Sequence, residues 1–596
     1  AKVLHIISSW KNDCLSYEDV EGTGNSFIER EHIRLFGEYQ KRLKSFDAMD
    51  FDDLILNVNK LFQKRSEVLE KYRNIFKYIL VDEYQDTNKA QFVLVRMLSE
   101  KHRNIFVVGD DDQSIYGWRG ARVENILSFN KEFPEASVYK LEDNYRSSQS
   151  ILDFANDIIK YVSVRSEKNL NAALDASGED VRIERCSDDR DEARKVTERL
   201  KSLVGNGKSG YSEIAVIFRT NAQSRVFEEI MLSENIPYTV IGGTGFYDRK
   251  EIKDCMAYLS LILNQKDDLS CERIINRPAR GIGKKSIERL ETGTEGILNT
   301  VLTGSYTGIK GKAAKSIEEF RDLYKDLIRM EEKGDKTSFI LSEVMDRTGY
   351  VSILEKEDTD ESLSRVDNIN ELFNAVFRWE EDNPEKGLRD FLEEVSLTTD
   401  LDRHDSSSEK VSLMTFHAAK GLEYGTVFLT GIEDGIIPSV RNLDDRKALD
   451  EECRLLYVGS TRAKKHLSIS FAEFRRRFGI EKPMSPSRFI KSYIPERSPL
   501  HSNRRPDRSI PFGASGKKYS GGSSGPGKEY EDYSQETVEY SIGEVVEHDK
   551  FGKGKIMNID GQGKNMRLTI LFENGVRKKI VAGFVKQIPA YYREDV

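Results

Sequence analysis

The chain has 596 residues, too many for one hydrophobic core, so several domains are expected. Its formal net charge of −9 excludes a uniformly basic protein, but it does not exclude nucleic-acid binding, which depends on local basic surfaces. The cysteines lack paired metal spacing and no apolar run reaches membrane-spanning length, which predicts a cytoplasmic protein with reduced thiols and no membrane partner.

Residues 1–75 are rich in charged side chains and are predicted to be helical. Aromatic and aliphatic residues recur at helical spacing between Phe36 and Phe46. Asp50 is expected to cap a further helix, whose first turn contains two more aspartates.

The short apolar run Tyr78–Val81 predicts a buried strand of a parallel sheet. Asp82 and Glu83 follow it directly. Ligands of open α/β sheets bind beyond the carboxyl ends of the strands, and Mg²⁺ prefers one or two carboxylates together with phosphate oxygens. The pair therefore predicts a metal and nucleotide site, although acidic residues also end many buried strands by chance.

A second apolar strand, Asn104–Val108, is separated from the first by a predicted helix, Asn88–Glu100. It ends in Gly-Asp and continues into the run Asp111–Ala121, which contains Gln113 and several aromatic residues. Farther along the chain comes the tetrapeptide Asn144–Ser147.

In their order and spacing, these segments closely resemble motifs II, III and IV of the UvrD/PcrA/Rep family of superfamily 1A DNA helicases. The resemblance implies an α/β fold with RecA-like motor domains of the P-loop NTPase type, the first one incomplete. Helical insertion subdomains and a small C-terminal SH3/Tudor-like β-barrel complete the implied fold. The implied divisions, in chain order, are 1–75 (partial helical subdomain 1B), 76–142 (the later part of motor domain 1A), 143–265 (first part of motor domain 2A), 266–405 (helical subdomain 2B), 406–494 (second part of 2A), 495–538 (flexible linker) and 539–596 (barrel).

The sequence contains no Gly-x-x-x-x-Gly-Lys-Ser/Thr stretch before Asp82. Gly22–Ser26 is the nearest glycine-rich piece, but it lacks the lysine and a preceding strand. A phosphate cradle needs backbone N–H groups at a helix N-terminus and a lysine that reaches the phosphates. We therefore expect an N-terminally truncated helicase whose chain alone is inactive.

Later segments extend the resemblance. Residues 213–225 and 238–254 resemble motif IVa and its continuation, where Arg249, Lys250 and Lys253 form either a solvated helix face or part of the nucleotide and DNA path. In the helical insertion, Gly281, Gly283 and Lys284 belong to a Gly-Ile-Gly turn that opens a helix. Such a turn can present N–H groups to a DNA phosphate, and a plain helical-hairpin turn is the alternative.

Residues 410–424 resemble motif V and residues 451–463 resemble motif VI. His417, in motif V, is either a packed structural histidine or, as the resemblance implies, a link between DNA and nucleotide. At the C-terminus, four short strands are predicted, and the resemblance implies a Tudor-like module that binds RNA polymerase. They are 544–546, 554–557, 568–572 and 577–581.

By resemblance, Asp82 holds Mg²⁺, Glu83 is the base and Gln113 senses the γ-phosphate of ATP. Arg146 and Arg462 would serve as arginine fingers, a role that suits the planar, always-charged guanidinium. Glu423 would hold the ribose. These assignments make Mg²⁺ and ATP the expected cofactors.

On the DNA side, Tyr116, Trp118 and Arg119 lie in one aromatic-rich turn that can stack bases without reading sequence. The alternative is that Trp118 is a core residue. The expected substrates are single-stranded DNA and junctions of single- and double-stranded DNA.

The expected function is an ATP-dependent 3′–5′ DNA helicase in repair and replication. The alternative, favoured by the missing phosphate loop, is a catalytically inactive protein that binds DNA and RNA polymerase. A third hypothesis, a helicase–nuclease subunit, is less favoured, because the C-terminal region predicts a β-barrel in place of a nuclease domain.

Overall fold

The computed structural model describes residues 2–173, 181–291, 296–404, 409–477, 480–494, 540, 544–548, 552–560, 567–572, 577–581 and 585–587. The chain divides into two compact units, Ala1–Lys491 and Ser492–Arg593. The predicted linker, residues 495–538, lies outside the described residues. Where the structure describes the chain, no helix combines the length and the apolar character needed to cross a membrane.

The first unit begins with a group of helices, the first three of which surround a small core that contains the fully buried Phe36. These helices are α1 (Lys2–Asn12), α2 (Tyr17–Val20), α3 (Phe27–Ser45), α4 (Phe51–Lys64) and α5 (Ser66–Ile75). The predicted cap of α4 is confirmed, because the Asp50 side chain accepts a hydrogen bond from the Asp53 amide. Both aspartates also pair with the buried ammonium of Lys11, at 2.6 and 2.8 Å.

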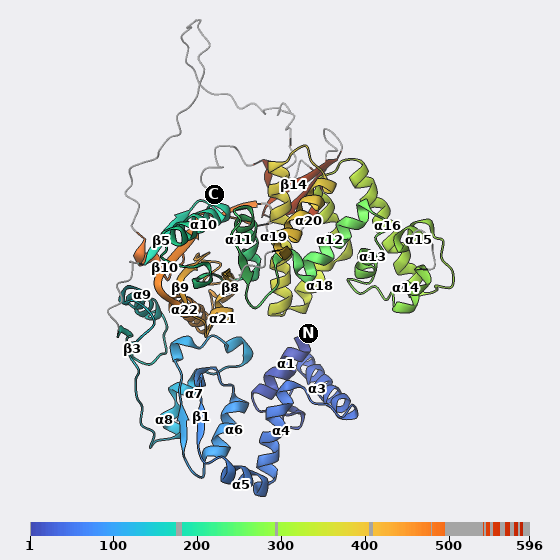
Figure 1. The fold of residues 1–596 in the computed structure, drawn as a ribbon. Coiled ribbons are helices and arrows are strands. Elements are labelled where there is room, and N and C mark those ends of the chain that lie inside the picture. The colour runs from blue at the N-terminus through green and yellow to red at the C-terminus, as the bar shows by residue number, and fades with distance from the viewer. Residues whose placement is uncertain are drawn as a thin grey trace, which may run out of the picture. The chain divides into compact units, whose positions relative to one another are not determined.

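Two parallel strands, β1 (Ile79–Val81) and β2 (Ile105–Val107), follow, with α6 (Lys89–Ser99) between them in sequence and beside β1 (Figure 1). The strands and the helix were predicted, but the expected burial of the first strand is wrong. Leu80 is 75% exposed and Phe106 is 60% exposed. The physical reason is that the described part of this sheet has two strands, and no described layer covers the face that displays these side chains.

The larger sheet has six parallel strands in the order β5-β10-β9-β6-β8-β7. Its strands are β5 (Arg182–Cys186), β6 (Ile214–Phe218), β7 (Tyr238–Val240), β8 (Val411–Thr415), β9 (Tyr424–Leu429) and β10 (Ala463–Ala472). Every residue of the central β6 is buried. Strands from before and after the helical insertion thus interleave in one sheet.

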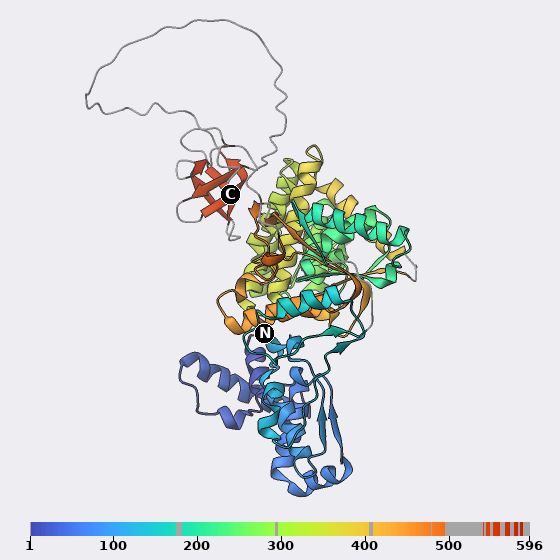
Figure 2. The ribbon, with the colours of Figure 1, turned by 90° about the vertical axis from the view of Figure 1, so that its left-hand side faces the viewer.

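Helices cover both faces of this sheet. Helices α10 (Asp189–Gly205) and α11 (Ser224–Ser233) pack against it in one apolar core that contains Leu200, Phe227 and Phe428. Helix α22 (Arg446–Ser460) contacts β9, β10 and α9 (Gln149–Ile159). Figure 2 shows α9 and α22 (cyan and orange) running side by side. Smaller elements of the unit are α7 (Glu124–Leu127), α8 (Phe129–Glu132), α21 (Phe416–Ala419) and the strand pairs β3 (Asp143–Asn144) with β4 (Asn171–Ala172) and β11 (Phe474–Arg477) with β12 (Ile480–Pro483).

The insertion between β7 and β8 is helical, as predicted. It contains α12 (Lys250–Leu263), α13 (Asp268–Ile274), α14 (Lys284–Leu290), α15 (Ile297–Thr303), α16 (Lys312–Glu332), α17 (Thr337–Thr348), α18 (Tyr350–Glu357), α19 (Asp360–Asp382) and α20 (Leu388–His404). The reading of Arg249 as part of a solvated face is wrong. Its guanidinium is buried and donates to Asn368 Oδ1 at 2.9 Å and Ser224 Oγ at 2.7 Å, which joins α19 to α11.

The second unit is a five-stranded antiparallel sheet around an apolar core that includes Ile556 and Phe572 (red in Figure 2). Its strands are β13 (Val545–His548), β14 (Gly552–Asp560), β15 (Arg567–Phe572), β16 (Arg577–Val581) and β17 (Lys586–Gln587). The four predicted strands are confirmed. Gly554 is required here, because a Cβ atom would lie 2.6 Å from the Ile570 side chain.

Candidate functional site

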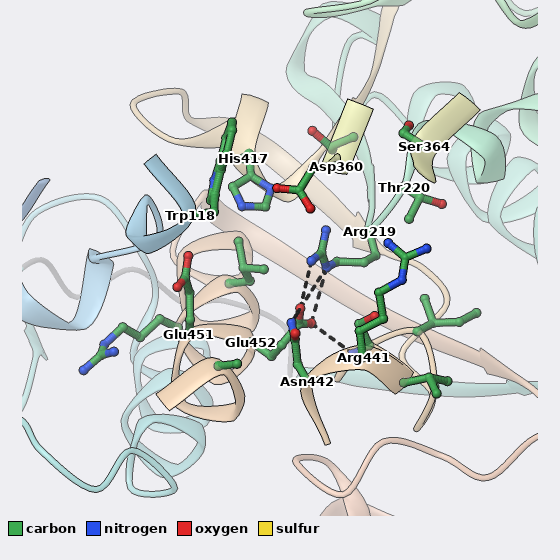
Figure 3. Close-up of a pocket in the computed structure, with 18 of the residues that line it drawn as sticks. Trp118, Arg219, Thr220, Asp360, Ser364, His417, Arg441, Asn442, Glu451 and Glu452 are labelled. Carbon is green, nitrogen blue, oxygen red and sulfur yellow. Dashed lines mark hydrogen bonds and ion pairs between the residues drawn. The ribbon is translucent and has the colours of Figure 1, made fainter. Parts of the chain in front are cut away.

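A large cavity of the first unit, about 1900 Å³, lies where the residues after β2 meet the end of β6 and the first half of α22. Figure 3 shows labelled side chains from all three regions facing it. Among those lining it are Trp118, Arg219, His417, Arg441, Glu451 and Glu452.

One wall of this cavity is aromatic. Trp118 is 43% exposed, so the alternative that it is a core residue is wrong. The Arg119 guanidinium lies 4.5 Å from the centroid of the Trp118 ring, and the His417 ring meets the indole edge-on at 6.2 Å. The Tyr116 ring lies 6.3 Å from the His417 ring. A solvent-accessible indole braced by a cation and a second ring is a surface on which a base can stack.

His417 is neutral at physiological pH. Burial, followed by the charges of Arg219 and Arg119, lowers its pKa to about 4. The ring therefore adds no positive charge to the cavity, and it supports the aromatic wall by packing.

Two adjacent glutamates of α22, Glu451 and Glu452, contact residues of the cavity wall, and sequence analysis missed both roles. Glu452 accepts from the Arg219 guanidinium at 2.8 Å and from Asn442 at 2.8 Å (Figure 3). Glu451 accepts the Gly117 N–H at 3.2 Å, and burial raises the pKa of its carboxyl. Gly117 precedes Trp118, so α22 directly contacts the aromatic turn.

The carboxylates after β1 line a second, smaller cavity of about 350 Å³. Asp82 is exposed there, and Glu83 adopts a left-handed conformation with φ 49°. Gln85 donates to Glu83 Oε2 at 2.6 Å. Hard carboxylate oxygens at the end of a parallel strand fit Mg²⁺, which needs one or two such ligands beside phosphate oxygens. Among the described residues no cluster of three or more potential metal ligands occurs.

Lys420, which follows α21, joins this region to the six-stranded sheet. Its ammonium lies 2.5 Å from Asp86 Oδ2, 2.7 Å from the Gln113 carbonyl oxygen and 3.2 Å from Glu83 Oε2. Burial raises the pKa of Asp86, and Lys420 opposes that effect. This lysine was not among the predicted site residues, because nothing in a sequence marks a contact that spans more than 300 positions.

Predicted site residues from both halves of the first unit meet around Gln113. Arg462 Nη2 donates to Gln113 Oε1 at 3.3 Å. Arg462 is buried, and burial, followed by repulsion from Arg146, lowers its pKa to about 10, so it stays charged at neutral pH. Arg146 pairs with Glu423 at 2.7 Å, and Lys464 pairs with the same carboxylate at 2.8 Å.

Tyr145, beside Arg146, is a further candidate that sequence analysis missed. Its side chain is 72% exposed. An exposed aromatic next to the Arg146–Glu423 pair offers a flat surface to a ring system. The signal that could have revealed it was an aromatic residue in the Asn144–Ser147 tetrapeptide.

The Gly-Ile-Gly turn lies at α14 in the helical insertion. Gly281 has φ 78°, Gly283 precedes the first turn of α14, and Lys284 is exposed. Arg280 turns inward instead, where it donates to the Ile274 carbonyl oxygen and to Tyr258. These residues do not join the cavities described above.

Comparison with known proteins gives three family matches. Residues 1–134 match the UvrD/REP helicase N-terminal domain, residues 139–474 the UvrD-like helicase C-terminal domain, and residues 542–585 the PcrA/UvrD tudor domain.

The chain is also similar along nearly its whole length to curated proteins named ATP-dependent DNA helicase PcrA. It is 38% identical to the one from Staphylococcus epidermidis RP62A over 597 residues, covering 99% of this chain and 80% of that protein. It is likewise 38% identical to the one from Bacillus subtilis 168 over 593 residues, covering 98% and 80%.

Proposed function

This chain belongs to the UvrD/REP helicase family, and from that premise we propose that it is an ATP-dependent DNA helicase that moves 3′ to 5′ along single-stranded DNA. Its substrates would be single strands and their junctions with duplex DNA, in repair and replication. The relatives are named as helicases and lend no support to the inactive binding protein considered from the sequence.

The observation that best supports this proposal is the convergence of two cations from the second half of the unit on the first half. Lys420 contacts Asp86, and Arg462 contacts Gln113. A nucleotide held between these halves would have cations on one side and carboxylates on the other. Binding would then draw the halves together, and hydrolysis would release them, which is the cycle that a translocating motor requires.

The proposed chemistry is phosphoryl transfer to water. Mg²⁺, when bound beside Asp82, would neutralise phosphate charge and orient the phosphates. Glu83 would accept the proton of the attacking water, and Gln113 would orient that water. Arg462 would stabilise the charge that develops on the γ-phosphate, and so would Arg146 once it leaves Glu423. An arginine in this role raises the rate of hydrolysis roughly a thousandfold.

For the DNA path, we propose base stacking on Trp118, with Tyr116, Arg119 and His417 as its support. Stacking tolerates any base, and a motor that moves along DNA needs such tolerance. Gly281, Gly283 and Lys284 are proposed to hold duplex phosphates through backbone N–H groups and one positive charge.

A Glu83→Gln variant tests the proposed base. Measured in the phosphate-loop fusion described below, its kcat for ATP hydrolysis stimulated by single-stranded DNA should fall at least about 100-fold, since a general base contributes that much or more. DNA affinity should stay within twofold. The matched control is Glu67→Gln, because Glu67 is an exposed residue of α5 that pairs with Arg65. Normal turnover by the Glu83 variant would contradict the assignment.

The 596 residues contain no Gly-x-x-x-x-Gly-Lys-Ser/Thr stretch, which leads to a second expectation. We expect weak ATP hydrolysis from these 596 residues alone, because no glycine-rich loop with its lysine is present to hold the phosphates. The assay should compare this chain with a fusion that adds a segment containing a Gly-x-x-x-x-Gly-Lys-Ser/Thr phosphate loop. Activity in the fusion alone would support the proposal, and inactivity in both would contradict it.

For the second unit we propose binding to RNA polymerase, supported by its match to the PcrA/UvrD tudor domain. Deleting residues 539–596 should abolish co-purification with purified core RNA polymerase and leave DNA binding intact. Retained co-purification would reject this partner for the unit.

A further inference from the structure

Three consecutive aspartates lie between β2 and the aromatic turn, and they are unusually enclosed. The side chain of Asp112 is fully buried, that of Asp111 is nearly so, and that of Asp110 is 24% exposed. Like charges this close repel one another strongly in a low-dielectric environment. The arrangement therefore requires neutralising groups from elsewhere in the chain.

Those groups come from a short segment between α9 and β4. The Lys168 ammonium lies 2.5 Å from Asp110 Oδ1, 2.6 Å from Asp111 Oδ1 and 3.2 Å from Asp112 Oδ2. Arg165 binds Asp112 with two parallel hydrogen bonds, at 3.0 and 2.8 Å. Burial lowers the pKa of Lys168, but the three carboxylates together raise it above its usual range, so the lysine is charged.

Asp110 is also the point where the proposed catalytic groups meet. Its Oδ2 accepts from Gln113 Nε2 at 2.8 Å, and its backbone N–H donates to Gln85 Oε1 at 3.0 Å. Gln85 in turn donates to Glu83, and Gln113 accepts from Arg462. One aspartate thus connects the proposed base, the proposed γ-phosphate sensor and one arginine.

We propose that Lys168 is a positioning residue for ATP hydrolysis, which acts through Asp110 to fix the Gln113 side chain and, through Gln113, the Arg462 guanidinium. This inference rests on the proposed function for its catalytic consequence. The series of contacts from Lys168 through Asp110 and Gln113 to Arg462, here called the relay, follows from the geometry alone. Lys168 neutralises Asp110 without occupying the oxygen that Gln113 uses. Both amide atoms of Gln113 are then engaged, which sets its orientation before nucleotide binds.

The relay joins the two halves of the first unit. Lys168 belongs to the segment matched by the C-terminal helicase domain, whereas the aspartates belong to the N-terminal one. Gln113 can therefore hold its orientation only while both halves of the unit are in contact. A lysine that served stability alone would leave the Gln113–Arg462 geometry unchanged when removed.

The test compares Lys168→Met, which keeps the length and loses the charge, with Lys168→Arg, which keeps the charge. Lys160→Met is the matched control, since Lys160 is exposed at the end of α9 and pairs with Asp157 at the surface. The first measurement is backbone hydrogen–deuterium exchange in the full chain without nucleotide, followed at residues 110–116 and 458–463.

We expect Lys168→Met to speed exchange about tenfold in both segments, as local opening becomes easier, with at least partial recovery in Lys168→Arg and no change in the control. In a Gln113→Ala background, Lys168→Met should have no further effect at residues 458–463, because the relay is already broken. Unchanged exchange at 458–463 in Lys168→Met, or a full additional effect in the Gln113→Ala background, would overturn the relay.

The second measurement is DNA-stimulated ATP hydrolysis, in the chain or in the phosphate-loop fusion. Lys168→Met should lower kcat about tenfold or more and leave KM for ATP within threefold, since Lys168 orients a group without binding nucleotide. An unchanged kcat would overturn the catalytic role. If the unmodified protein hydrolyses no ATP in either form, the proposed function fails, and the exchange measurements still decide whether the relay exists.

Discussion

At the scale of single residues, Trp118 gives the most direct test of the DNA path. A Trp118→Ala change should weaken binding of single-stranded DNA about 5- to 150-fold, because a stacked base contributes about 1–3 kcal/mol. Trp118→Phe should recover part of this loss, since it keeps a smaller ring. Fluorescence anisotropy of a labelled oligonucleotide provides the measurement. Equal affinities of the wild type and Trp118→Ala would rule out stacking at this position.

His417 leads to a pH prediction. Its pKa is about 4 when folded against an ordinary value of 6.5, so the unfolded chain binds the proton more tightly. The free energy of unfolding should therefore decrease as pH falls from 6.5 towards 4, by up to about 3 kcal/mol from this residue.

Urea unfolding at pH 7.5 and pH 4.5 measures that effect. Relative to the wild type, His417→Gln should lose less stability on acidification, because carboxylates elsewhere contribute equally to both proteins. Identical acid sensitivity of the two proteins would mean that the folded pKa of His417 is not depressed.

Sequence reasoning at this scale found the residues that belong to compact motifs and missed their long-range partners. Gln113 and Arg462 were predicted as site residues, and the structure brings them together at 3.3 Å. Lys168, Lys420 and Glu451 were missed. Each acts through a partner far away in sequence, and a lone lysine or glutamate looks the same whether it is solvated or buried against charge.

At the scale of elements, the contact between α22 and the aromatic turn is testable through Gly117. A Cβ atom there would lie 2.5 Å from Glu451 Oε2, so Gly117→Ala should push this carboxylate away, break its hydrogen bond with the N–H of residue 117 and weaken DNA binding about tenfold. Adding Glu451→Ala should have little further effect, because the contact between α22 and the turn is already lost. A double-mutant cycle of oligonucleotide affinities measures this coupling.

Gly205→Ala is the matched control for that cycle, since a Cβ at Gly205 meets nothing within 4 Å. Strictly additive effects of the Gly117 and Glu451 changes would show that the turn does not depend on α22.

The strand β1 shows what sequence cannot predict about an element. Its position, its direction and the carboxylates at its end followed from the apolar run and the charges beside it. Its burial did not follow, because burial depends on the layers around a strand and not on the strand itself. Leu80 and Phe106 are therefore exposed, in spite of their apolar character.

At the scale of the whole molecule, the net charge of −9 does not prevent cationic side chains from lining the proposed DNA path. Arg119, Arg219 and Arg441 line the large cavity, and Figure 3 shows the last two. The affinity for single-stranded DNA should therefore fall as salt rises, with a logarithmic slope of about −0.7 for each phosphate neutralised.

Arg441→Gln should make this slope shallower by about 0.7, and Lys201→Gln, at an exposed surface pair with Glu234, should not change it. Titrations between about 50 and 200 mM salt provide the measurement. A slope near zero for the wild type would exclude phosphate contacts in the cavity.

The sequence by itself determined the family, the order of the strands along the chain, the helical character of the insertion and the identity of Asp82, Glu83, Gln113 and Arg462 as candidates. It could do so because these features are local: a strand, its terminal carboxylates and a motif are each read within about a dozen residues. The tertiary structure decided the exposure of Trp118 and Leu80 and the burial of Arg249. It also decided the pairing of Lys168 with Asp110 and of Lys420 with Asp86. These depend on which distant segments meet, and the free energy of a buried charge or an exposed ring is set by its surroundings and not by its own chemistry.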